Sequence, residues 1–336
     1  MDFFTRYLPA LEKEMREITA LRATSPTLLY GMLHYHLGWV NRDFQPVQRN
    51  AGKHLRPLFL LLACEAQGGA WRPALPAAAA VELLHNFSLI HDDIEDQDPR
   101  RRGYPTLWTI WGTAQALNAG DALFNLAYQA FLRLREREVE PALILQLQAR
   151  YLDTITQLTE GQCRDIGFES VTTVAEETYL QMVGGKTAAL LSFCCEAGGL
   201  LAKSPAERVM ALREFGYNLG MSFQMQDDLL GLWGDPAQTG KPVGSDLRQH
   251  KKTLPILHGM AESAELRELL TLPTLTEKEL TRAQQLLEDT GSHAYTQTRA
   301  RNYHQQALDA LVRSRGTGAA QEALHTVVQR LLGREK

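Results

Sequence analysis

The sequence predicts an all-α protein that forms a single domain over residues 1–336. Long segments carry apolar residues at helical spacing, whereas alternating apolar and polar stretches of strand length are scarce. Breakers separate these segments: PRRRGYP, SPAE and GDPAQTGKPVGSD. Because the expected helices are mostly apolar, we expect a helical bundle whose central helices are buried on several sides.

Four segments show the clearest helical patterns. They cover residues 73–93, 123–142, 177–202 and 212–235. The first is rich in alanine and leucine and has no glycine or proline after Pro76. The second keeps its helical spacing as far as Pro141. No repeat, low-complexity tract or linker-like change of composition divides the chain.

Composition excludes several classes of protein. Apolar residues make up 44% and charged residues 22% of the chain, as in ordinary globular proteins. A net charge of -4 argues against nonspecific nucleic-acid binding. The N-terminus lacks a signal-peptide pattern, and no apolar run approaches the roughly 20 residues of a membrane span. We expect a soluble, cytoplasmic protein with reduced, buried cysteines and no metal site built from them.

The stretch SLIHDDIEDQDPRRRGYPT, residues 88–106, contains a dense acidic cluster. His85, Ser88, Asp92 and Asp96 are spaced by three, four and four, so they form one stripe on a helix, with Asp93 beside it. Such a set of carboxylate oxygens suits Mg²⁺, which completes its shell with water and phosphate. The alternative is a solvated helix end, but carboxylates that continue an apolar face are costly unless compensated.

Basic residues follow this cluster and occur at two other places. Arg101 and Arg102 have guanidinium groups that can bind phosphate oxygens. Two further pairs of residues and one histidine each have two interpretations. Lys53 and Arg56 form a helix start or an anion site; Lys186 and Thr187 interrupt an apolar helix or face an anion; His85 is a core histidine or a cavity wall.

A second acidic helix end occurs in FQMQDDLLGLWGD. Gln224, Asp227 and Gly231 share one stripe, and Asp228 lies beside it. Lys241, Lys251 and Lys252 follow in the next loop. Two such helix ends that face each other would hold several Mg²⁺ ions against one diphosphate. The two clusters together, each followed by basic residues, indicate a metal-dependent diphosphate site.

In this order the motifs resemble those of the trans-isoprenyl diphosphate synthases, or polyprenyl synthetase family. From about residue 50 to about residue 257, they read GK-x-x-RP, H-x-x-S-L-I-H-DD-x-x-D, RRG-x-PT, GD, GQ, KT, FQ-x-x-DD, GK and K-x-x-P. The resemblance implies the isoprenoid synthase helical bundle with a deep central cavity, usually as a homodimer. The first 45 and the last 75 or so residues add little to it.

The resemblance also implies a role for each matching residue. It assigns Mg²⁺, three ions in such enzymes, to Asp92, Asp93, Asp96, Asp227 and Asp228. It assigns the allylic diphosphate to Arg101, Lys186 and Lys241, with Gln224 nearby. It assigns isopentenyl diphosphate to Lys53, Arg56, His85 and Arg102, and Thr187, next to Lys186, is a further substrate-binding residue. Lys251 and Asp246 match positions that help close the site. The implied reaction is head-to-tail condensation of the two substrates, with the proton lost to the released diphosphate.

The chain departs from the family pattern at three positions. Gly231 replaces the usual third aspartate of the second motif, so either Asp235 compensates or two carboxylates suffice. His54 stands where arginine is common, and Ala51 where glycine is common. Gly231 should remove one possible metal ligand, whereas neither His54 nor Ala51 removes a residue assigned to substrate or metal.

Product length is expected to depend on bulky residues just before the first motif. Phe87 and Ser88 precede Asp92 by five and four residues, and the aromatic resembles the short-chain geranylgeranyl type. By helix angle Phe87 lies about 140° from Asp92, so this role rests on the resemblance. A core aromatic between helices is the alternative. Farnesyl diphosphate is the next candidate product, ahead of longer polyprenyl diphosphates.

Three other functions are alternatives to the synthase. A class I terpene cyclase would share the acidic helix but would not need Lys53, Arg56 and Arg102 as a second diphosphate site. A silent partner subunit would have lost the acidic motifs. A structural metal-binding protein would leave the paired lysines and arginines unexplained. The sequence therefore predicts a prenyltransferase that makes geranylgeranyl diphosphate.

Overall fold

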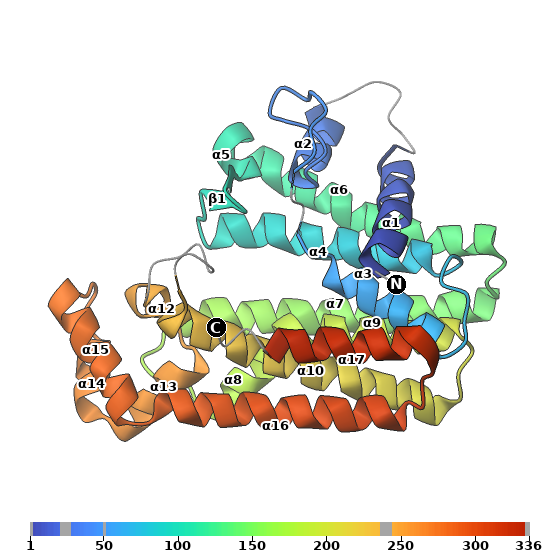
Figure 1. Cartoon of the computed structure of the whole chain (residues 1–336). Helices are drawn as coiled ribbons and strands as arrows, with labels where there is room; N and C mark the ends of the chain where they lie inside the picture. Colours follow the sequence, from blue (N-terminus) through green and yellow to red (C-terminus); the bar gives the residue numbers. More distant parts are fainter. Residues whose placement is uncertain (1–2, 21–27, 50–51, 236–243, 333–336) are drawn as a thin grey trace. The chain divides into compact units, whose positions relative to one another are not determined.

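The computed structural model describes residues 3–20, 28–49, 52–235 and 244–332 and confirms the all-α prediction (Figure 1). In these residues the strand structure is one short hairpin and one isolated bridge, Val40 to Pro46. The hairpin pairs β1 (Arg100–Arg101) with β2 (Tyr104–Pro105) in antiparallel register. No described helix is both long and apolar enough to cross a membrane.

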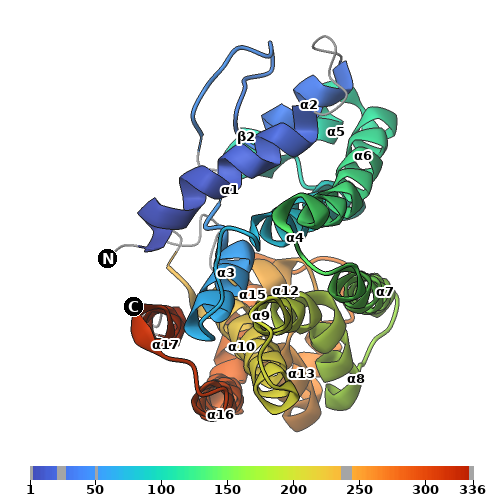
Figure 2. The same cartoon turned by 90° about the vertical axis from the view of Figure 1, so that its right-hand side faces the viewer.

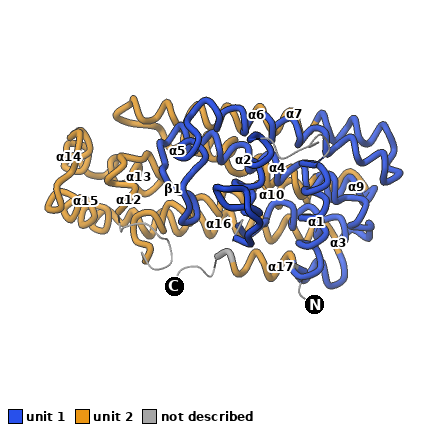
Figure 3. Tube along the Cα trace, turned by 90° about the horizontal axis from the view of Figure 1, so that it is seen from above, with its two compact units in different colours: residues 1–149, 197–204, 317–323 blue, residues 150–196, 205–316, 324–336 orange. Residues whose placement is uncertain are grey.

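The chain divides into two compact units, shown in two colours in Figure 3. Unit 1 comprises residues 1–149, 197–204 and 317–323, and unit 2 comprises residues 150–196, 205–316 and 324–336. Each unit is described by itself below. Three helices, α7 (Pro141–Glu169), α9 (Ala189–Leu201) and α17 (Gly318–Leu332), contribute residues to both. The prediction of one domain stays a prediction.

Unit 1 contains the first acidic cluster. Besides the start of α7, its helices are α1 (Phe3–Ala20), α2 (Leu28–His36), α3 (Leu55–Ala66), α4 (Leu75–Glu95), α5 (Leu107–Trp111), α6 (Thr113–Leu132) and the 3₁₀ helix η1 (Arg133–Arg137). Helices α4 and α6 lie side by side, as Figures 1 and 2 show. Gly120 on α6 permits this approach, since a Cβ there would lie 2.3 Å from the His91 ring.

Helix α4 forms because a run of alanines and leucines starts from a proline in the first turn, where proline is tolerated. Its first ten residues are all buried. Only towards its C-terminal end does it become partly exposed, and the acidic cluster begins there. The core of unit 1 therefore fixes the helix that presents the first carboxylates.

Unit 2 contains the second acidic cluster. Besides the parts of α7, α9 and α17, its helices are α8 (Glu176–Val183), the π-helix η2 (Gly184–Ala188), α10 (Ala206–Trp233), α12 (Ser245–Arg248), α13 (Leu254–Glu262), α14 (Ala264–Leu269), α15 (Glu277–Asp289) and α16 (Ser292–Arg313). Helices α10 and α16 run side by side (Figure 1). The long helix α10 carries the second motif at its C-terminal end.

Two expected helices differ from the observed ones. The segment 123–142 does not continue to Pro141: α6 ends at Leu132, η1 follows, and Pro141 begins α7, because proline cannot continue a helix but suits its first position. The segment 177–202 is interrupted by η2. The expectation of buried thiols is wrong for Cys163, which is exposed, whereas Cys64, Cys194 and Cys195 are buried; all four are free.

Candidate active site

The first acidic helix end is held by an arginine of the hairpin. Arg101 Nε lies 2.6 Å from Asp93 Oδ1, and its Nη2 lies 3.2 Å from Asp92 Oδ2. Asp93 is buried, Asp92 is half-buried, and Asp96, just past the end of α4, is exposed. Burial raises the pKa of Asp93 to about 6, although Arg101 acts in the opposite direction. Two of the three predicted carboxylates thus share one counter-charge.

The hairpin that carries Arg101 is anchored to the end of α4. Thr106 Oγ1 and Trp108 Nε1 donate to the Asp98 carbonyl, at 3.0 and 2.9 Å. Arg102 and Gly103 turn the chain with positive φ angles of 53° and 83°. This tight turn, which the RRG motif provides, places two successive guanidinium groups beside the acidic helix end.

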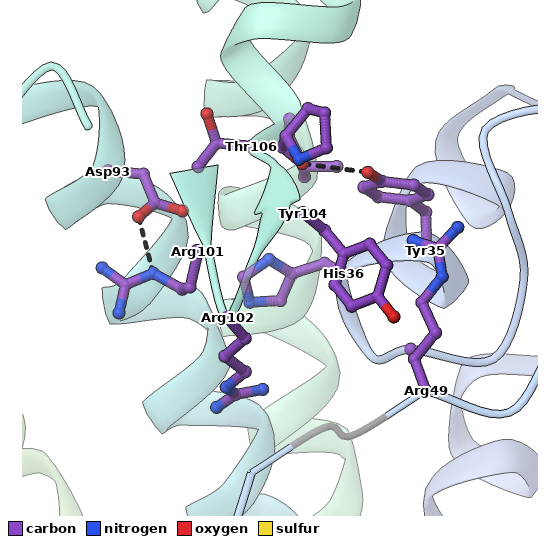
Figure 4. A pocket seen from close by; sticks show the side chains of 11 residues that line it. Tyr35, His36, Arg49, Asp93, Arg101, Arg102, Tyr104 and Thr106 are labelled. Atoms are coloured by element: carbon purple, nitrogen blue, oxygen red, sulfur yellow. Dashed lines mark hydrogen bonds and ion pairs between the residues drawn. The ribbon is translucent and has the colours of Figure 1, made fainter. Parts of the chain in front are cut away.

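A small pocket of about 40 Å³ opens beside this hairpin (Figure 4). The guanidinium of Arg49 lies over the rings of Tyr35 and Tyr104, at 4.8 and 4.3 Å from their centroids. The Tyr35 hydroxyl donates to the Pro105 carbonyl at 2.9 Å. Burial, together with the nearby arginines, lowers the pKa of His36 to about 3. The N-terminal segment, which adds little to the family resemblance, therefore supports the hairpin directly.

The predicted basic cluster is partly assembled on α3 and α4. Arg56 Nη1 lies 3.1 Å from His85 Nε2. Burial lowers the pKa of His85 well below its usual value, and the charge of Arg56 adds to this effect. His85 is therefore neutral and accepts a hydrogen bond from Arg56 through Nε2. His85 thus orients an arginine, and its place in a cavity wall stays a prediction.

The loop before α3 packs against the hairpin turn. Gly52 has φ +109°, and a Cβ on it would lie 2.7 Å from Nη2 of Arg102. The glycine of the GK motif is required here both for its backbone angle and for this close approach. Lys53 next to it is exposed. The four residues predicted for isopentenyl diphosphate thus come from three neighbouring pieces of unit 1.

The second acidic helix end is held by neutral groups. Asp228 is buried and accepts hydrogen bonds from the Tyr179 hydroxyl, from Gln224 Nε2 at 3.1 Å and from the Leu254 amide at 3.1 Å. Burial raises its pKa to about 7 against the effect of these donors. Thr187 Oγ1 donates to Gln224 Oε1 at 2.9 Å, so the KT and FQ-x-x-DD motifs form one network. Asp227 is exposed.

The structure explains the missing third aspartate of the second motif. A Cβ on Gly231 would lie 2.1 Å from Oδ2 of Asp246, so the Asp246 carboxylate fills the space above the glycine. Asp246 is buried, and Ser245 Oγ donates to the Gly231 carbonyl at 3.2 Å. Asp235, the residue first expected to compensate, is exposed. The glycine at position 231 of the motif and the aspartate of the later GSD sequence, taken together, could have predicted this contact.

Lys186 lies on η2 and forms an ion pair with Asp165 of α7. Two glycines allow α7 and η2 to meet: a Cβ on Gly161 would lie 2.2 Å from the Lys186 amide nitrogen, and one on Gly185 would lie 2.4 Å from the Gln157 carbonyl. The GQ motif is thus explained by helix contact. Asp165 was not identified from the sequence. Lys251 is exposed, and Lys241 lies outside the described residues.

Phe87 lies in a column of aromatic side chains on α4 and α6. Its ring centroid is 4.6 Å from that of His91 and 4.9 Å from that of Phe124, and Phe124 is 5.1 Å from Tyr128. Phe87 is half-buried, so it is not a fully enclosed core residue. Ser88 Oγ donates to the His85 carbonyl at 2.9 Å and so is engaged with its own helix.

The donor chemistry suits a hard divalent cation. Both helix ends carry aspartates, whose carboxylate oxygens are ligands that Mg²⁺ prefers. Within the described ranges, no three His, Cys, Asp or Glu side chains are arranged to hold a metal by themselves. Mg²⁺ usually takes one or two carboxylates and completes its shell with water and substrate phosphate, so pairs such as Asp92 and Asp93 fit that requirement.

Comparison with known proteins decides the family. The model of the polyprenyl synthetase family matches residues 38–289. The chain belongs to the polyprenyl synthetase family. It is 40% identical over 312 residues to a (2E,6E)-farnesyl diphosphate synthase of Mycobacterium tuberculosis, covering 89% of this chain and 85% of that protein. It is 41% identical over 285 residues to a geranylgeranyl diphosphate synthase of the same organism, covering 83% and 80%.

A solved polyprenyl synthetase confirms the fold. The structure of a polyprenyl synthase from Caulobacter crescentus, complexed with calcium and isoprenyl diphosphate, superposes with a TM-score of 0.83. It is 27% identical and covers 100% of this chain and 98% of its own. The present chain is a short-chain trans-polyprenyl diphosphate synthase, which is a prenyltransferase. The family resemblance and the enzyme class predicted from the sequence are therefore confirmed.

Proposed function

We propose that this synthase condenses isopentenyl diphosphate with an allylic diphosphate and releases geranylgeranyl diphosphate. The observation that carries the product length is the aromatic pair of Phe87 and Phe124, which joins α4 to α6. Phe87 lies five residues before Asp92, which is about 7.5 Å along a helix axis. A bulky pair at that distance limits how far a growing prenyl chain extends along α4. The relatives named above include both farnesyl and geranylgeranyl synthases, so identity alone does not choose between them.

We assign metal binding to the carboxylates of both helix ends. They are Asp92, Asp93 and Asp96 in unit 1, and Asp227 and Asp228 in unit 2, with Asp246 beside Gly231 as a further oxygen donor. Mg²⁺ bound there, three ions by family resemblance, would offset the charge on the departing diphosphate. The related Caulobacter synthase, solved with calcium and isoprenyl diphosphate, supports a divalent cation at this kind of site.

We assign the diphosphates to the basic residues. Arg101, Lys186 and Lys241, with Thr187 and Gln224, take the allylic diphosphate, and Lys53, Arg56, His85 and Arg102 take that of isopentenyl diphosphate. In the structure Arg101 is paired with Asp92 and Asp93, and Lys186 with Asp165. Cation binding to the aspartates would release Arg101 for phosphate. The neutral His85 keeps Arg56 oriented without adding a charge of its own.

The reaction that these residues support is ionisation, carbon–carbon bond formation and proton loss. The allylic carbon–oxygen bond breaks, and the diphosphate leaves with the electron pair. The double bond of isopentenyl diphosphate attacks the cation and forms the new carbon–carbon bond. A proton is then lost to the released diphosphate, so no side-chain base is required. The chain's basic residues stabilise the leaving group by preorganised charge, which is a large term in such catalysis.

Incubation with defined substrates tests the function and the product length. The purified protein is given Mg²⁺, labelled isopentenyl diphosphate and, separately, dimethylallyl, geranyl and farnesyl diphosphates. Products are dephosphorylated and sized by chromatography, and a linear alcohol of twenty carbons is expected. A chain of fifteen carbons, or of thirty and more, would keep the enzyme class and refute the role of Phe87. Cyclic hydrocarbon without condensation would identify a cyclase instead.

We propose that the synthase is a homodimer. Large apolar side chains are exposed along α6 and α7: Leu132 is 51% exposed, Leu145 68% and Leu152 50%. Exposed apolar side chains of this size favour a protein–protein contact. Light scattering after size exclusion would measure the mass in solution. A monomer, or a dimer unchanged by Leu145→Lys with Leu152→Lys, would contradict an interface on these helices.

A further inference from the structure

The residue at the start of α3 has an unusual backbone. His54 precedes the helix with φ 44° and ψ 39°, the left-handed region that β-carbon-bearing residues rarely adopt. Its carbonyl accepts the Leu58 amide at 3.2 Å and so begins the helical hydrogen bonding. Because this conformation is disfavoured, a tertiary contact must hold it.

That contact is a buried ion pair with α4. His54 Nδ1 lies 2.8 Å from Glu82 Oε1, and the Glu82 side chain is only 2% exposed. Asn86 Nδ2 donates to the Glu82 carboxylate at 3.1 Å and to the Glu82 carbonyl at 2.8 Å, which fixes the carboxylate on its helix. A buried carboxylate without a cationic partner is costly, so the pairing is specific.

The pair lies between the groups assigned to isopentenyl diphosphate. Lys53 and Arg56 flank His54 in the sequence. Glu82 and His85 are three residues apart on α4 and therefore lie on one face of it. His54 contacts the first and Arg56 the second, at 3.1 Å. The start of α3 is thus bound to α4 at two successive points, and Lys53 is the residue immediately before the first of them.

We propose that the ion pair of His54 with Glu82 positions Lys53 and Arg56 for the diphosphate of isopentenyl diphosphate. This inference rests on the proposed function of those two residues. His54 is a positioning residue, since it reaches the substrate only through its neighbours. Its protonated form fits Glu82, and arginine, common at this position in the family, would supply the same positive charge.

The charges around the pair favour its ionised form. Burial by itself would lower the pKa of His54, but the hydrogen bond and charge of Glu82 raise it above its usual value. Glu12 of α1 adds to this rise, and Arg102 of the hairpin opposes it. Burial would raise the pKa of Glu82, but His54, Arg56 and Asn86 bring it below its usual value.

The raised pKa of His54 determines how the ion pair with Glu82 depends on pH. A histidine with a raised pKa contributes its pairing fully below its unfolded value of about 6.5 and loses it as the pH rises through the higher folded value. The paired Glu82 stays ionised until the pH falls below its own lowered value. Binding of isopentenyl diphosphate should therefore weaken on the alkaline side, as His54 loses its proton.

The variants His54→Asn and His54→Arg separate the effect of the positive charge opposite Glu82 from the effect of the backbone conformation at residue 54. Asparagine tolerates the left-handed angles and the helix start, but it has no charge for Glu82. Calorimetric titration with isopentenyl diphosphate and Mg²⁺, without an allylic substrate, measures binding alone. His54→Asn should bind it on the order of tenfold more weakly, as when an orienting residue is lost, and His54→Arg should bind like the wild type. His34→Asn is the matched control, since that histidine bonds Thr19 of α1 at 3.1 Å.

Steady-state kinetics and pH distinguish positioning from loss of structure. His54→Asn should raise KM for isopentenyl diphosphate and leave KM for the allylic substrate within about twofold, while the alkaline rise in KM should be absent in His54→Arg. Equal changes for both substrates, failure of arginine to restore binding, or an unaltered His54→Asn would overturn the proposal. A wild type that binds isopentenyl diphosphate without condensing it would refute the proposed function and leave the titration as the test of His54.

Discussion

The two acidic helix ends of this synthase hold their buried aspartates in different ways. On α4, Asp93 is paired with a cation, Arg101, which also contacts Asp92. On α10, Asp228 is surrounded by neutral donors, the Tyr179 hydroxyl, the Gln224 amide and a backbone amide. The pKa of each carboxyl is raised by burial, to about 6 for Asp93 and about 7 for Asp228.

The difference shows two ways in which a protein can hold a buried carboxylate. A carboxylate with a built-in counter-ion stays ionised more readily, and a bound cation must displace that counter-ion. A carboxylate with neutral donors keeps its orientation but lacks a positive partner, so it favours protonation until a cation arrives. Asp92 and Asp93 therefore share one counter-ion, whereas we expect Asp228 to depend more strongly on a bound cation and on pH.

Removing a ligand at the first end should have the largest effect. Asp92→Ala is expected to lower turnover by at least about a hundredfold, because a carboxylate assigned to the metal is lost while the half-buried position tolerates alanine. Single-turnover rates and thermal unfolding measure activity and fold together. Glu95→Ala, an exposed carboxylate in the same turn, is the control and should retain activity. Turnover close to normal in Asp92→Ala would remove the first helix end from the mechanism.

The stability of the metal-free protein and the activity of the enzyme should change in opposite directions with pH. Both raised carboxyl groups bind protons more tightly in the folded state than at their usual value of 3.8. Stability without metal should therefore fall as the pH rises from about 4 to about 7, while turnover rises as the carboxylates ionise for Mg²⁺. Thermal unfolding in chelator and kcat in saturating Mg²⁺ across this range measure the two trends.

Asp228→Asn measures how much Asp228 contributes to the pH dependence of metal-free stability. Without a titrating group at this position, the metal-free stability should depend less on pH between about 6 and 7. Asp93→Asn should have a smaller effect at the upper end of this range, since the pKa of Asp93 is nearer 6. A metal-free stability that increases with pH over the whole range would contradict the assignment of raised pKa values to these groups.

Gly231→Ala tests the contact between the second motif and Asp246. A Cβ would lie 2.1 Å from the Asp246 carboxylate, so the buried side chain would have to move. We expect a loss of about 1–3 kcal/mol of stability and a melting temperature lower by a few degrees, with reduced turnover. Gly167→Ala, on α7 with open space around it, should be neutral or slightly stabilising. Equal behaviour of the two variants would show that Asp246 does not need the glycine.

Sequence patterns predicted the parts of the site that lie within one helix. The order of residues in 85–96 was enough to place Asp92 and Asp93 on the end of α4, with Asp96 just past it, since helical spacing fixes which side chains share a face. The FQ-x-x-DD motif likewise lies on one helix, α10, where Gln224 contacts Asp228, the aspartate expected beside the stripe. Helix ends were less predictable, because the 3₁₀ turn after Leu132 depends on tertiary packing as well as local propensity.

Contacts between distant segments were not predictable in this way. The stacking of Arg49 on Tyr35 and Tyr104 joins residues up to 55 positions apart, and no local pattern marks it. The pairing of Lys186 with Asp165 depends on a close approach of two helices. Asp246 could have been suspected only from the missing side chain at Gly231. Tertiary partners determine which charges are balanced, and that balance differs between the two helix ends.

The variant expected to change the rate least is Phe87→Ala, which should change product length. It also distinguishes the two helix ends. Phe87 precedes Asp92 by five residues, and Phe223 precedes Asp227 by four; both are half-buried. Only Phe87 is proposed to limit the chain, through its contact with Phe124 on α6. Phe87→Ala should shift the product to longer prenyl alcohols with turnover within a few fold, because removing the ring opens space next to Phe124.

Phe223→Ala is the matched control for that variant. It removes an aromatic ring of equal size close to the acidic end of the other helix, so a general loosening of the protein would act in both variants. Chromatography of the dephosphorylated products should show longer chains for Phe87→Ala alone. Longer products from both variants would mean that chain length responds to packing in general, and unchanged products from Phe87→Ala would leave Phe87 as a packing residue between α4 and α6.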